Sequence, residues 1–177
     1  QYLSKNSKVK LKLENFQITG SFKLRGAVNK LLSLSEREKQ QGVIAVSTGN
    51  HGKGVAYASK VLGIKSTIYM SSMVPNYRKE AIENLGAKVE IVGKNSDEAD
   101  LFAKQLSKEK NITLIHPFDD EDIIIGQGTV GLEMLKEFPE VDTVIIPTSG
   151  GGLISGIAQA IKLQKPDTKI IAVSMER

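Results

Sequence analysis

Cysteine and tryptophan are absent from the 177-residue sequence, and only two histidines are present. Without cysteine the chain has no disulfide, no thiolate nucleophile and no zinc–thiolate site, and two histidines are too few for most metal cages. We therefore expect no metal site. Long apolar runs are also missing: no stretch approaches the roughly 20 residues of a membrane span, and residues 1–10 lack the apolar core of a signal peptide. These absences predict a cytoplasmic protein without a membrane partner.

A strong excess of one charge sign is missing as well. Lys and Arg total 24 against 20 Asp and Glu, and the lysines are scattered among acids with few aromatic residues between them. Nucleic-acid-binding surfaces usually gather basic residues in a patch or stripe, so we expect no nucleic-acid partner. What is present, 40% hydrophobic and 25% charged residues, is typical of a globular protein with a substantial core.

Short runs rich in β-branched residues alternate with stretches of helical periodicity. The expected strands are 42–47, 65–70, 87–92, 111–115, 143–147 and 169–174. The expected helices are 51–63, 77–86, 96–110, 126–138 and 151–164, several of them closed by glycine. Strands that are apolar on both faces predict an α/β fold in which parallel, twisted sheets are covered by helices.

A polar, acid-rich stretch, HPFDDED at 116–122, interrupts this alternation. We interpret it as the crossing between two subdomains. The predicted division places residues 1–44 and 120–177 in a larger domain and residues 45–119 in a smaller α/β domain. Movement of the smaller domain could close a cleft over a ligand.

Two strand-to-helix turns are rich in glycine: TGNHGKG at 48–54 and SGGGLISG at 149–156. In parallel sheets, ligands bind beyond the carboxyl ends of the strands, where these turns are expected. Glycine lets backbone amides approach an anion, and the start of a helix favours negative charge. Each turn is therefore a candidate site for a phosphate or a carboxylate, although close helix–sheet packing alone explains many single turns of this kind.

Lys23, in TGSFKLRGA at 19–27, stands where a cation is usually disfavoured. If Ser21 caps the following helix, Lys23 lies in the first turn, where the positive field and partial burial lower the pKa of an amine. Gly26 and Ala27 are small and leave room for a flat ligand on the same face. A neutral amine is a nucleophile, so Lys23 is a candidate for imine formation; the alternative is a surface lysine beside an apolar stripe.

The second glycine turn also imitates a dinucleotide-binding site. Gly150, Gly152 and Gly156 open a helix after a strand, and Glu176 follows the next strand about where a ribose-binding acid would lie. A nicotinamide-dependent oxidoreductase is therefore one alternative, and a non-catalytic amino-acid or nucleotide-binding module is another. The oxidoreductase interpretation leaves the segments around Lys23 and around residues 47–52 without a purpose.

Several polar residues between these motifs are expected to be structural. His116 is interpreted as a loop side chain whose hydrogen bonds are satisfied, Phe118 as a packing residue and Gln127 as a bridge between the subdomains. The acids at 119–122 could hold a cation, but acids at the start of a helix are more simply explained by the helix dipole.

Four segments together resemble the signature segments of the fold-type II pyridoxal phosphate-dependent enzymes, whose fold is like that of the tryptophan synthase β subunit. They are KLENFQITGSFKLRGA at 12–27, STGNHGKGVA at 47–56, PFDDEDIIIGQGT at 117–129 and SGGGLISG at 149–156. They follow in the family's order, are distributed along most of the chain and are similar to segments of serine/threonine dehydratases and serine racemases. Details such as STGNHG and the closing AVSMER resemble the hydroxyectoine-utilisation dehydratases of that group.

The resemblance implies roles for the matching residues. Lys23 would bind the aldehyde of pyridoxal 5'-phosphate and then act as base or acid at the substrate Cα, and Asn50 would hydrogen-bond the cofactor's ring oxygen. The cofactor phosphate would be held by the amides of Ser149, Gly150, Gly151, Gly152 and Leu153. The substrate carboxylate would be surrounded by Ser47, Thr48, Gly49 and His51.

The resemblance further implies a homodimeric lyase of the threonine/serine dehydratase type, which converts a small hydroxy amino acid into a 2-oxo acid and ammonia. An amino-acid racemase stays open as an alternative, because Thr48 stands where racemases have a serine. A β-replacement enzyme of the same fold is a further alternative. The family's larger domain continues past the position of Arg177, so we expect the chain to be part of a longer enzyme.

Overall fold

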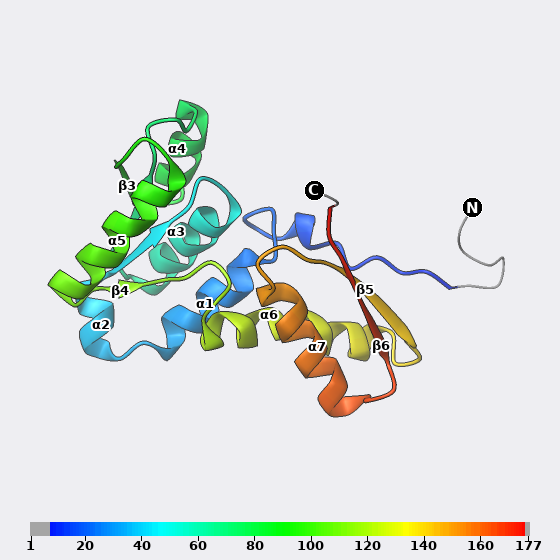
Figure 1. The fold of residues 1–177 in the computed structure, drawn as a ribbon. Helices are drawn as coiled ribbons and strands as arrows, with labels where there is room; N and C mark the ends of the chain where they lie inside the picture. Colours follow the sequence, from blue (N-terminus) through cyan, green and yellow to red (C-terminus); the bar gives the residue numbers. More distant parts are fainter. Residues whose placement is uncertain (1–7, 176–177) are drawn as a thin grey trace.

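The computed structural model describes residues 8–175, which form an α/β structure with two parallel sheets (Figure 1). The N-terminal part contains a short 3-10 helix, η1 (Glu14–Phe16), and the helices α1 (Lys23–Ser33) and α2 (Glu36–Gln41). The four-stranded part contains β1 (Val43–Val46), α3 (Asn50–Leu62), β2 (Ser66–Met70), α4 (Asn76–Glu83), β3 (Lys88–Ile91), α5 (Ser96–Lys110) and β4 (Thr113–Leu114). The last part contains α6 (Glu121–Glu137), β5 (Thr143–Pro147), α7 (Gly152–Gln164) and β6 (Lys169–Val173).

The sheets confirm the predicted α/β class with parallel strands. The first sheet has the strand order β3-β2-β1-β4 and the second pairs β5 with β6, with every pairing parallel. All six expected strands occur, each starting and ending within two residues of its predicted bounds. In the first sheet, β2 lies on one side of β1 and β4 on the other. The strand order therefore reverses between β1 and β4, and ligands of such sheets bind at this switch point, outside the carboxyl ends of the strands.

Apolar cores lie on both faces of the first sheet and under the second. The largest core joins α1 and α3 to the sheet through fully buried side chains such as Leu31, Val55 and Ile68. A smaller cluster around Ile44 and Tyr69 lies on the α5 side of the sheet. The third core, which contains Val130, Ile146, Ile157 and Ile161, joins α6 and α7 to β5 and β6. These cores explain why strands with apolar residues on both faces occur in this chain.

Helix α1 lies between the two halves of the molecule, with α3 on one side and α6 on the other (Figure 1). Glycines allow both close approaches. A Cβ added at Gly54 of α3 would lie 3.1 Å from the carbonyl carbon of Lys23, and one added at Gly126 of α6 would lie 2.6 Å from the Cα of Gly26. Gly26 also donates its amide to Oε1 of the buried Gln127, at 3.3 Å. Gly26 therefore serves helix packing, and our interpretation that it leaves room for a ligand is wrong.

Two helices differ from the sequence-based expectation. Helix α2 was not predicted, although Ser35 and Glu38 form a capping box at its start. Helix α6 begins at Glu121, five residues before its predicted start, with the Asp120 carboxylate accepting a hydrogen bond from the amide of Ile123 at 3.1 Å. In the described part of the chain, no helix has the length and apolar character needed to cross a membrane.

Candidate active site

Lys23 is the first residue of α1, as expected, but the helix does not begin with a serine cap. The N-cap residue is Phe22, which has helical backbone angles and no capping side chain. Ser21 is buried one residue earlier, and its hydroxyl accepts a long hydrogen bond of 3.4 Å from the Lys23 amide. The expected first-turn position of Lys23 is confirmed, whereas the assignment of Ser21 as N-cap residue is wrong by one position.

The amine of Lys23 is half-buried and faces a backbone carbonyl instead of an acid. Its Nζ donates a hydrogen bond to the carbonyl oxygen of Pro117 and lies 5.3 Å from the centre of the Phe22 ring. Burial lowers the pKa of the Lys23 amine, and within residues 8–175 it forms no ion pair with a carboxylate. A larger fraction of this amine is therefore neutral, and nucleophilic, than of an exposed lysine.

The connection between β4 and α6 joins Lys23 to the second glycine turn. Nδ1 of His116 accepts hydrogen bonds from the amides of Phe118 and Asp119, at 3.3 and 2.7 Å. The Phe118 ring lies against Gly150, where an added Cβ would meet the ring within 3.0 Å. A Cβ at Gly152 would likewise lie 2.8 Å from the Phe118 carbonyl oxygen. His116 and Phe118 therefore have the structural roles that were predicted for them.

The turn at 149–152 fits an anionic group such as a phosphate. It follows β5, and Gly151 adopts φ +90°, a left-handed conformation that glycine accepts without strain. The first turn of α7 carries no acidic residue and no side-chain cap, so its amides are available to a ligand. The turn brings Ser149, Gly150, Gly151, Gly152 and Leu153 together at the start of α7.

Gly156, by contrast, has a packing role. A Cβ at this position would lie 2.2 Å from the carbonyl oxygen of Ile124 and 2.6 Å from the amide nitrogen of Gly128. Contact between α6 and α7 thus accounts for the third glycine of the dinucleotide-like pattern. Glu176, the acid of that pattern, lies outside the described residues.

The turn after β1 presents a second uncapped helix start. Helix α3 begins at Asn50, its N-cap residue Gly49 supplies no side chain, and no acidic residue follows in the first turn. The Gly49 amide donates to the Ser47 hydroxyl at 3.2 Å, which shapes the turn, and the Asn50 side chain is exposed. Ser47, Thr48 and Gly49 are therefore placed beside free amides that could bind a carboxylate.

His51 lies in this turn's helix, but its ring points into the protein. It is buried, and Nε2 lies 2.9 Å from the carbonyl oxygen of Ile115, to which it donates. Burial lowers the pKa of His51 to about 4. The ring therefore joins the turn after β1 to the turn after β4 across the switch point, and only the backbone amide of His51 is left to meet a ligand.

Other residues of the site region were not found from sequence. The face of Phe22 and the carbonyl of Pro117 beside Lys23 follow from no local pattern. Arg25 donates to both oxygens of Glu14 and of Glu133, at 2.7–2.8 Å, and thereby ties η1 and α1 to α6. Its partners are 11 and 108 residues away in sequence, so helix periodicity could not identify them.

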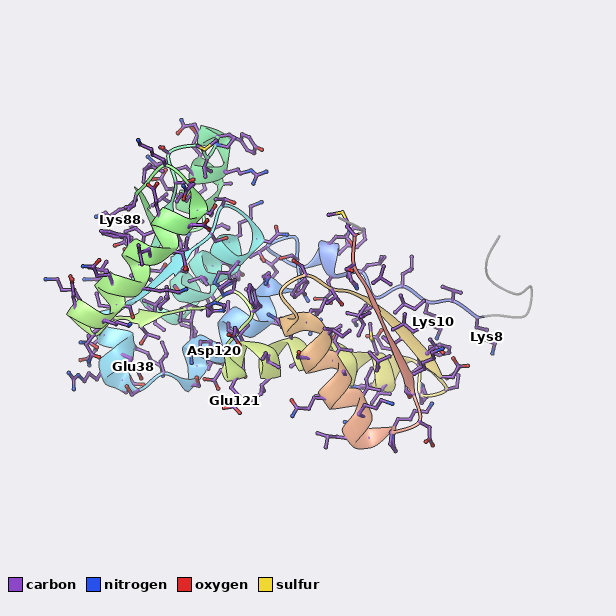
Figure 2. All side chains as sticks on the ribbon, viewed as in Figure 1. Lys8, Lys10, Glu38, Lys88, Asp120 and Glu121 are labelled. Atoms are coloured by element: carbon purple, nitrogen blue, oxygen red, sulfur yellow. The ribbon has the colours of Figure 1, made fainter. Side chains whose placement is uncertain are left out.

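The acids at the start of α6 pair with a lysine. Figure 2 labels Asp120 and Glu121 at this position, and Nζ of Lys30 lies 2.8 Å from Asp120 and 3.0 Å from Asp122. No group of three or more His, Asp or Glu side chains among residues 8–175 is arranged to hold a metal ion. The described geometry thus offers a nucleophilic amine and two helix starts that can bind anions. Such a set fits two ligands, one that carries an aldehyde and a phosphate and one that carries a carboxylate.

Comparisons with known proteins agree with this chemistry. A family model described as pyridoxal-phosphate dependent enzyme matches residues 1–177. The catabolic L-threonine dehydratase TdcB of Staphylococcus aureus is 48% identical over 178 residues, which cover 99% of this chain and 51% of that protein. The chain thus spans about half the length of the curated relatives it matches.

Two solved structures show the same arrangement. Threonine deaminase isoform 2 from Solanum lycopersicum superimposes with a TM-score of 0.90 and 43% identity, covering 92% of this chain and 48% of that one. Maize serine racemase superimposes with a TM-score of 0.85 and 39% identity, covering 90% and 48%. Both similarities include the fold and the sequence of the region that contains the candidate site.

Proposed function

The chain belongs to the family of pyridoxal-phosphate-dependent enzymes, and from this premise we propose that the protein is a dehydratase of a small hydroxy amino acid, threonine or serine first. The products would be a 2-oxo acid and ammonia. The observation that carries the proposal is the half-buried amine of Lys23, whose pKa burial lowers, in a chain with two uncapped, glycine-rich helix starts. Residues 117–118 link this amine to one of them, because Pro117 accepts from Lys23 and Phe118 packs against Gly150. Similarity to threonine dehydratase and threonine deaminase supports the same reaction class.

Each part of the cofactor has a matching group in the chain. When bound, pyridoxal phosphate supplies an aldehyde carbon that an amine can attack and a conjugated ring that accepts the electron pair left at Cα. Lys23 would provide that amine, and the Asn50 amide group would hydrogen-bond the ring oxygen. The phosphate would be bound by the amides of Ser149, Gly150, Gly151, Gly152 and Leu153, with the start of α7 favouring its charge.

The substrate would be oriented by the turn after β1. Ser47, Thr48, Gly49 and His51 would surround its carboxylate, with the Ser47 and Thr48 hydroxyls and the His51 amide as donors, because the Gly49 amide already donates to Ser47. The neutral amine of Lys23 would then take the proton from Cα, and the β-hydroxyl would leave as water with one proton given back, so no net proton is gained or lost in the elimination. Water hydrolyses the resulting enamine, which gives the 2-oxo acid and ammonia, so one water is lost and one is consumed.

The first test is a visible absorption spectrum of the full-length protein after addition of pyridoxal phosphate, followed by borohydride reduction and peptide mapping. We expect the cofactor to be trapped on Lys23 and the visible band to be missing from Lys23→Ala. Lys30→Ala is the matched control on the same helix, because Lys30 is paired with Asp120 and Asp122. Cofactor trapped on scattered lysines, or no band at all, would overturn the proposal.

A racemase of the same fold is a second candidate, and the placement of Thr48 favours it. Its hydroxyl is half-buried in the turn beside Asn50, where it could deliver a proton to Cα, and maize serine racemase is 39% identical. Thr48→Ala separates the two activities. Loss of racemisation with retained 2-oxo acid release would assign Thr48 as the second proton donor, whereas no racemisation by the unaltered protein would exclude this candidate.

We also propose a cytoplasmic homodimer, as the family resemblance suggests. Sedimentation of the full-length protein tests the dimer, and cell fractionation tests the location. A hydroxy amino acid derived from hydroxyectoine belongs in the same substrate screen as threonine and serine. Higher kcat/KM for that compound than for threonine would support a role in hydroxyectoine utilisation.

A further inference from the structure

A separate cavity of about 320 Å³ lies next to the turn after β1. Thr48 lines it on the β1 side, Ser71 and the residues that lead into α4 line it on the β2 side, and Asn95 lines it at the start of α5. Its lining includes one cationic side chain, that of Arg78, and no acidic one. The cavity thus sits at the carboxyl ends of parallel strands, where α/β sheets bind ligands, but it is not lined by Lys23 or the 149–152 turn.

The start of α4 lacks the negative group that helix starts usually attract. Its N-cap residue is Pro75, which has no capping side chain, and the first turn carries Arg78 and no acid. The neighbouring start of α5 shows the usual arrangement, because Asn95 caps the amide of Glu98 at 2.9 Å and the first turn contains two acids. A cation at an uncapped helix start is unfavourable unless an anion is bound nearby.

Ser71 supplies an independent observation on the same cavity. Its residue is only 4% exposed, it lines the cavity, and within residues 8–175 its hydroxyl makes no hydrogen bond to the protein. The fully buried hydroxyls without a partner in this range are those of Thr19 and Ser59, so the Ser71 oxygen keeps accessible surface and is open to a ligand or water in the cavity. The hydroxyl can donate to an oxyanion in the cavity.

The Arg78 guanidinium is free to contribute the charge. Nε donates to the hydroxyl of Tyr77 at 3.2 Å, and Nη1 makes a long contact of 3.4 Å with the Thr48 carbonyl oxygen. In the described part of the chain, Arg78 forms no ion pair with a carboxylate. Guanidinium groups bind carboxylate and phosphate through paired hydrogen bonds.

We propose that this cavity is a binding site for a small oxyanion, a phosphate or a carboxylate, held by the guanidinium of Arg78, the hydroxyl of Ser71 and the first amides of α4. The site does not depend on the function proposed above. Because Arg78 also contacts the Thr48 carbonyl, an anion that draws the guanidinium into the cavity also changes the support of the turn after β1.

The test is calorimetric titration of the full-length, cofactor-loaded protein with inorganic phosphate, repeated with acetate. We expect Arg78→Gln to weaken phosphate binding about tenfold or more, because a charge-assisted pair is lost, and Arg78→Lys to restore part of it. Ser71→Ala should weaken phosphate binding severalfold. Because Ser71 lines this cavity and belongs to neither the turn at 47–51 nor the turn at 149–152, this result would show that phosphate binds in the cavity. Lys79→Gln is the matched control, since Lys79 is the next residue of α4, does not line the cavity and lies near Glu83.

Displacement of phosphate by acetate would show that both oxyanions share the site, and failure to displace it would restrict the site to phosphate. Equal weakening by Arg78→Gln and Lys79→Gln would overturn the proposal, because only long-range charge would then matter. Absence of phosphate binding by the unaltered protein would overturn it as well. Circular dichroism of each variant shows whether α4 is still folded, and Arg78→Lys keeps the result interpretable if Arg78→Gln unfolds it.

Discussion

Two sets of contacts along helix α1, which we call seams, give partly buried basic side chains different hydrogen-bond partners. In the first, which we call the acidic seam, Arg25 and Lys30 face the carboxylates of Glu14, Glu133, Asp120 and Asp122. In the second, the carbonyl seam, Lys23 and His51 donate to the backbone carbonyls of Pro117 and Ile115, and neither pairs with a carboxylate within residues 8–175. The basic side chains of both seams are partly buried, so the two seams differ in whether these side chains meet carboxylates or backbone carbonyls.

The partners decide the protonation state. For Lys30, burial alone would lower the pKa, but the hydrogen bonds that it donates to Asp120 and Asp122 outweigh burial and raise the pKa. Lys23 has no such acid, and burial lowers the pKa of its amine. A carbonyl oxygen accepts a hydrogen bond from a neutral amine or imidazole as well as from a cation, so the carbonyl seam leaves the neutral form available. One helix thus carries a structural lysine and a lysine suited to chemistry seven residues apart.

Removing the amine from the carbonyl seam should have the largest effect. Lys23→Ala in the full-length protein is expected to lower kcat by about 10³-fold or more, because a positioned base contributes about 10²–10⁴-fold and covalent attachment of the cofactor is lost too. Lys30→Ala should change kcat by no more than severalfold. The measurement is steady-state release of 2-oxo acid from threonine and serine. Comparable losses in both variants would mean that the two seams do not differ in function.

The pH dependence of stability tests whether His51, in the carbonyl seam, is neutral in the folded protein. Its ordinary pKa of 6.5 falls to about 4 in the folded protein. Between these two pH values His51 is therefore protonated mainly in the unfolded chain and neutral in the folded protein. Stability should therefore be complete above pH 6.5 and should fall by about 3 kcal/mol as the pH drops from 6.5 through 4, since the shift is roughly 2.5 pKa units.

Urea unfolding as a function of pH measures this loss. His51→Gln keeps a donor for the Ile115 carbonyl and removes the titrating group, so its stability should depend less on pH between 6.5 and 4. His116→Gln serves as the control for the second histidine. An unchanged pH dependence in His51→Gln would show that other groups cause the acid sensitivity.

Replacement of Arg25 tests how much a cation of the acidic seam contributes to the free energy of unfolding. Arg25→Met should destabilise the protein by about 2 kcal/mol, because Glu14 and Glu133 lose their charged partner in a half-buried site. Hydrogen bonds from Arg25 are the main reason that the pKa of Glu133 falls to about 2. This contribution is present above pH 4.5 and lost as the pH falls toward 2, so the variant should differ less from the parent at low pH. A difference that grows on acidification would contradict this account.

The seams also show what local sequence patterns can predict. The strands, the glycine turns and the first-turn position of Lys23 were predictable because β-branched runs, glycine spacing and helix starts are local features. Helix α2 was missed although its capping box, Ser35 and Glu38, is equally local. The start of α6 was placed too late, because a run of three isoleucines followed by two glycines weakens the helix pattern.

The partners in both seams could not be predicted from such patterns. Lys23 and the Pro117 carbonyl are 94 residues apart, and the His51 ring is 64 residues from Ile115. The pattern STGNHG places a histidine at the start of a helix but does not say where its ring points. Packing of α1 between α3 and α6 sets these contacts, and helix packing between segments far apart in sequence is not encoded in a local pattern.

The smallest effect is expected at the exposed end of the acidic seam. Asp122 pairs with Lys30 at 3.0 Å and accepts from the Ser33 hydroxyl at 2.8 Å, and the Lys30 and Ser33 hydrogen bonds lower the pKa of Asp122. Because Lys30 keeps Asp120 as a second partner, Asp122→Asn should cost only about 0.5–1 kcal/mol near neutral pH. The contribution should vanish as the pH falls below the ordinary value of 3.8, where the unfolded chain takes up the proton first.

Glu121→Gln is the control for this variant, since Glu121 lies in the same first turn of α6 and shares the helix-dipole contribution (Figure 2). Urea unfolding at low salt and at 1 M salt separates the two contributions, because salt screens an exposed ion pair strongly. We expect Asp122→Asn to cost more than Glu121→Gln at low salt and the two to converge at 1 M. Equal costs at low salt would mean that the helix dipole alone stabilises this end, and that the acidic seam ends at Asp120.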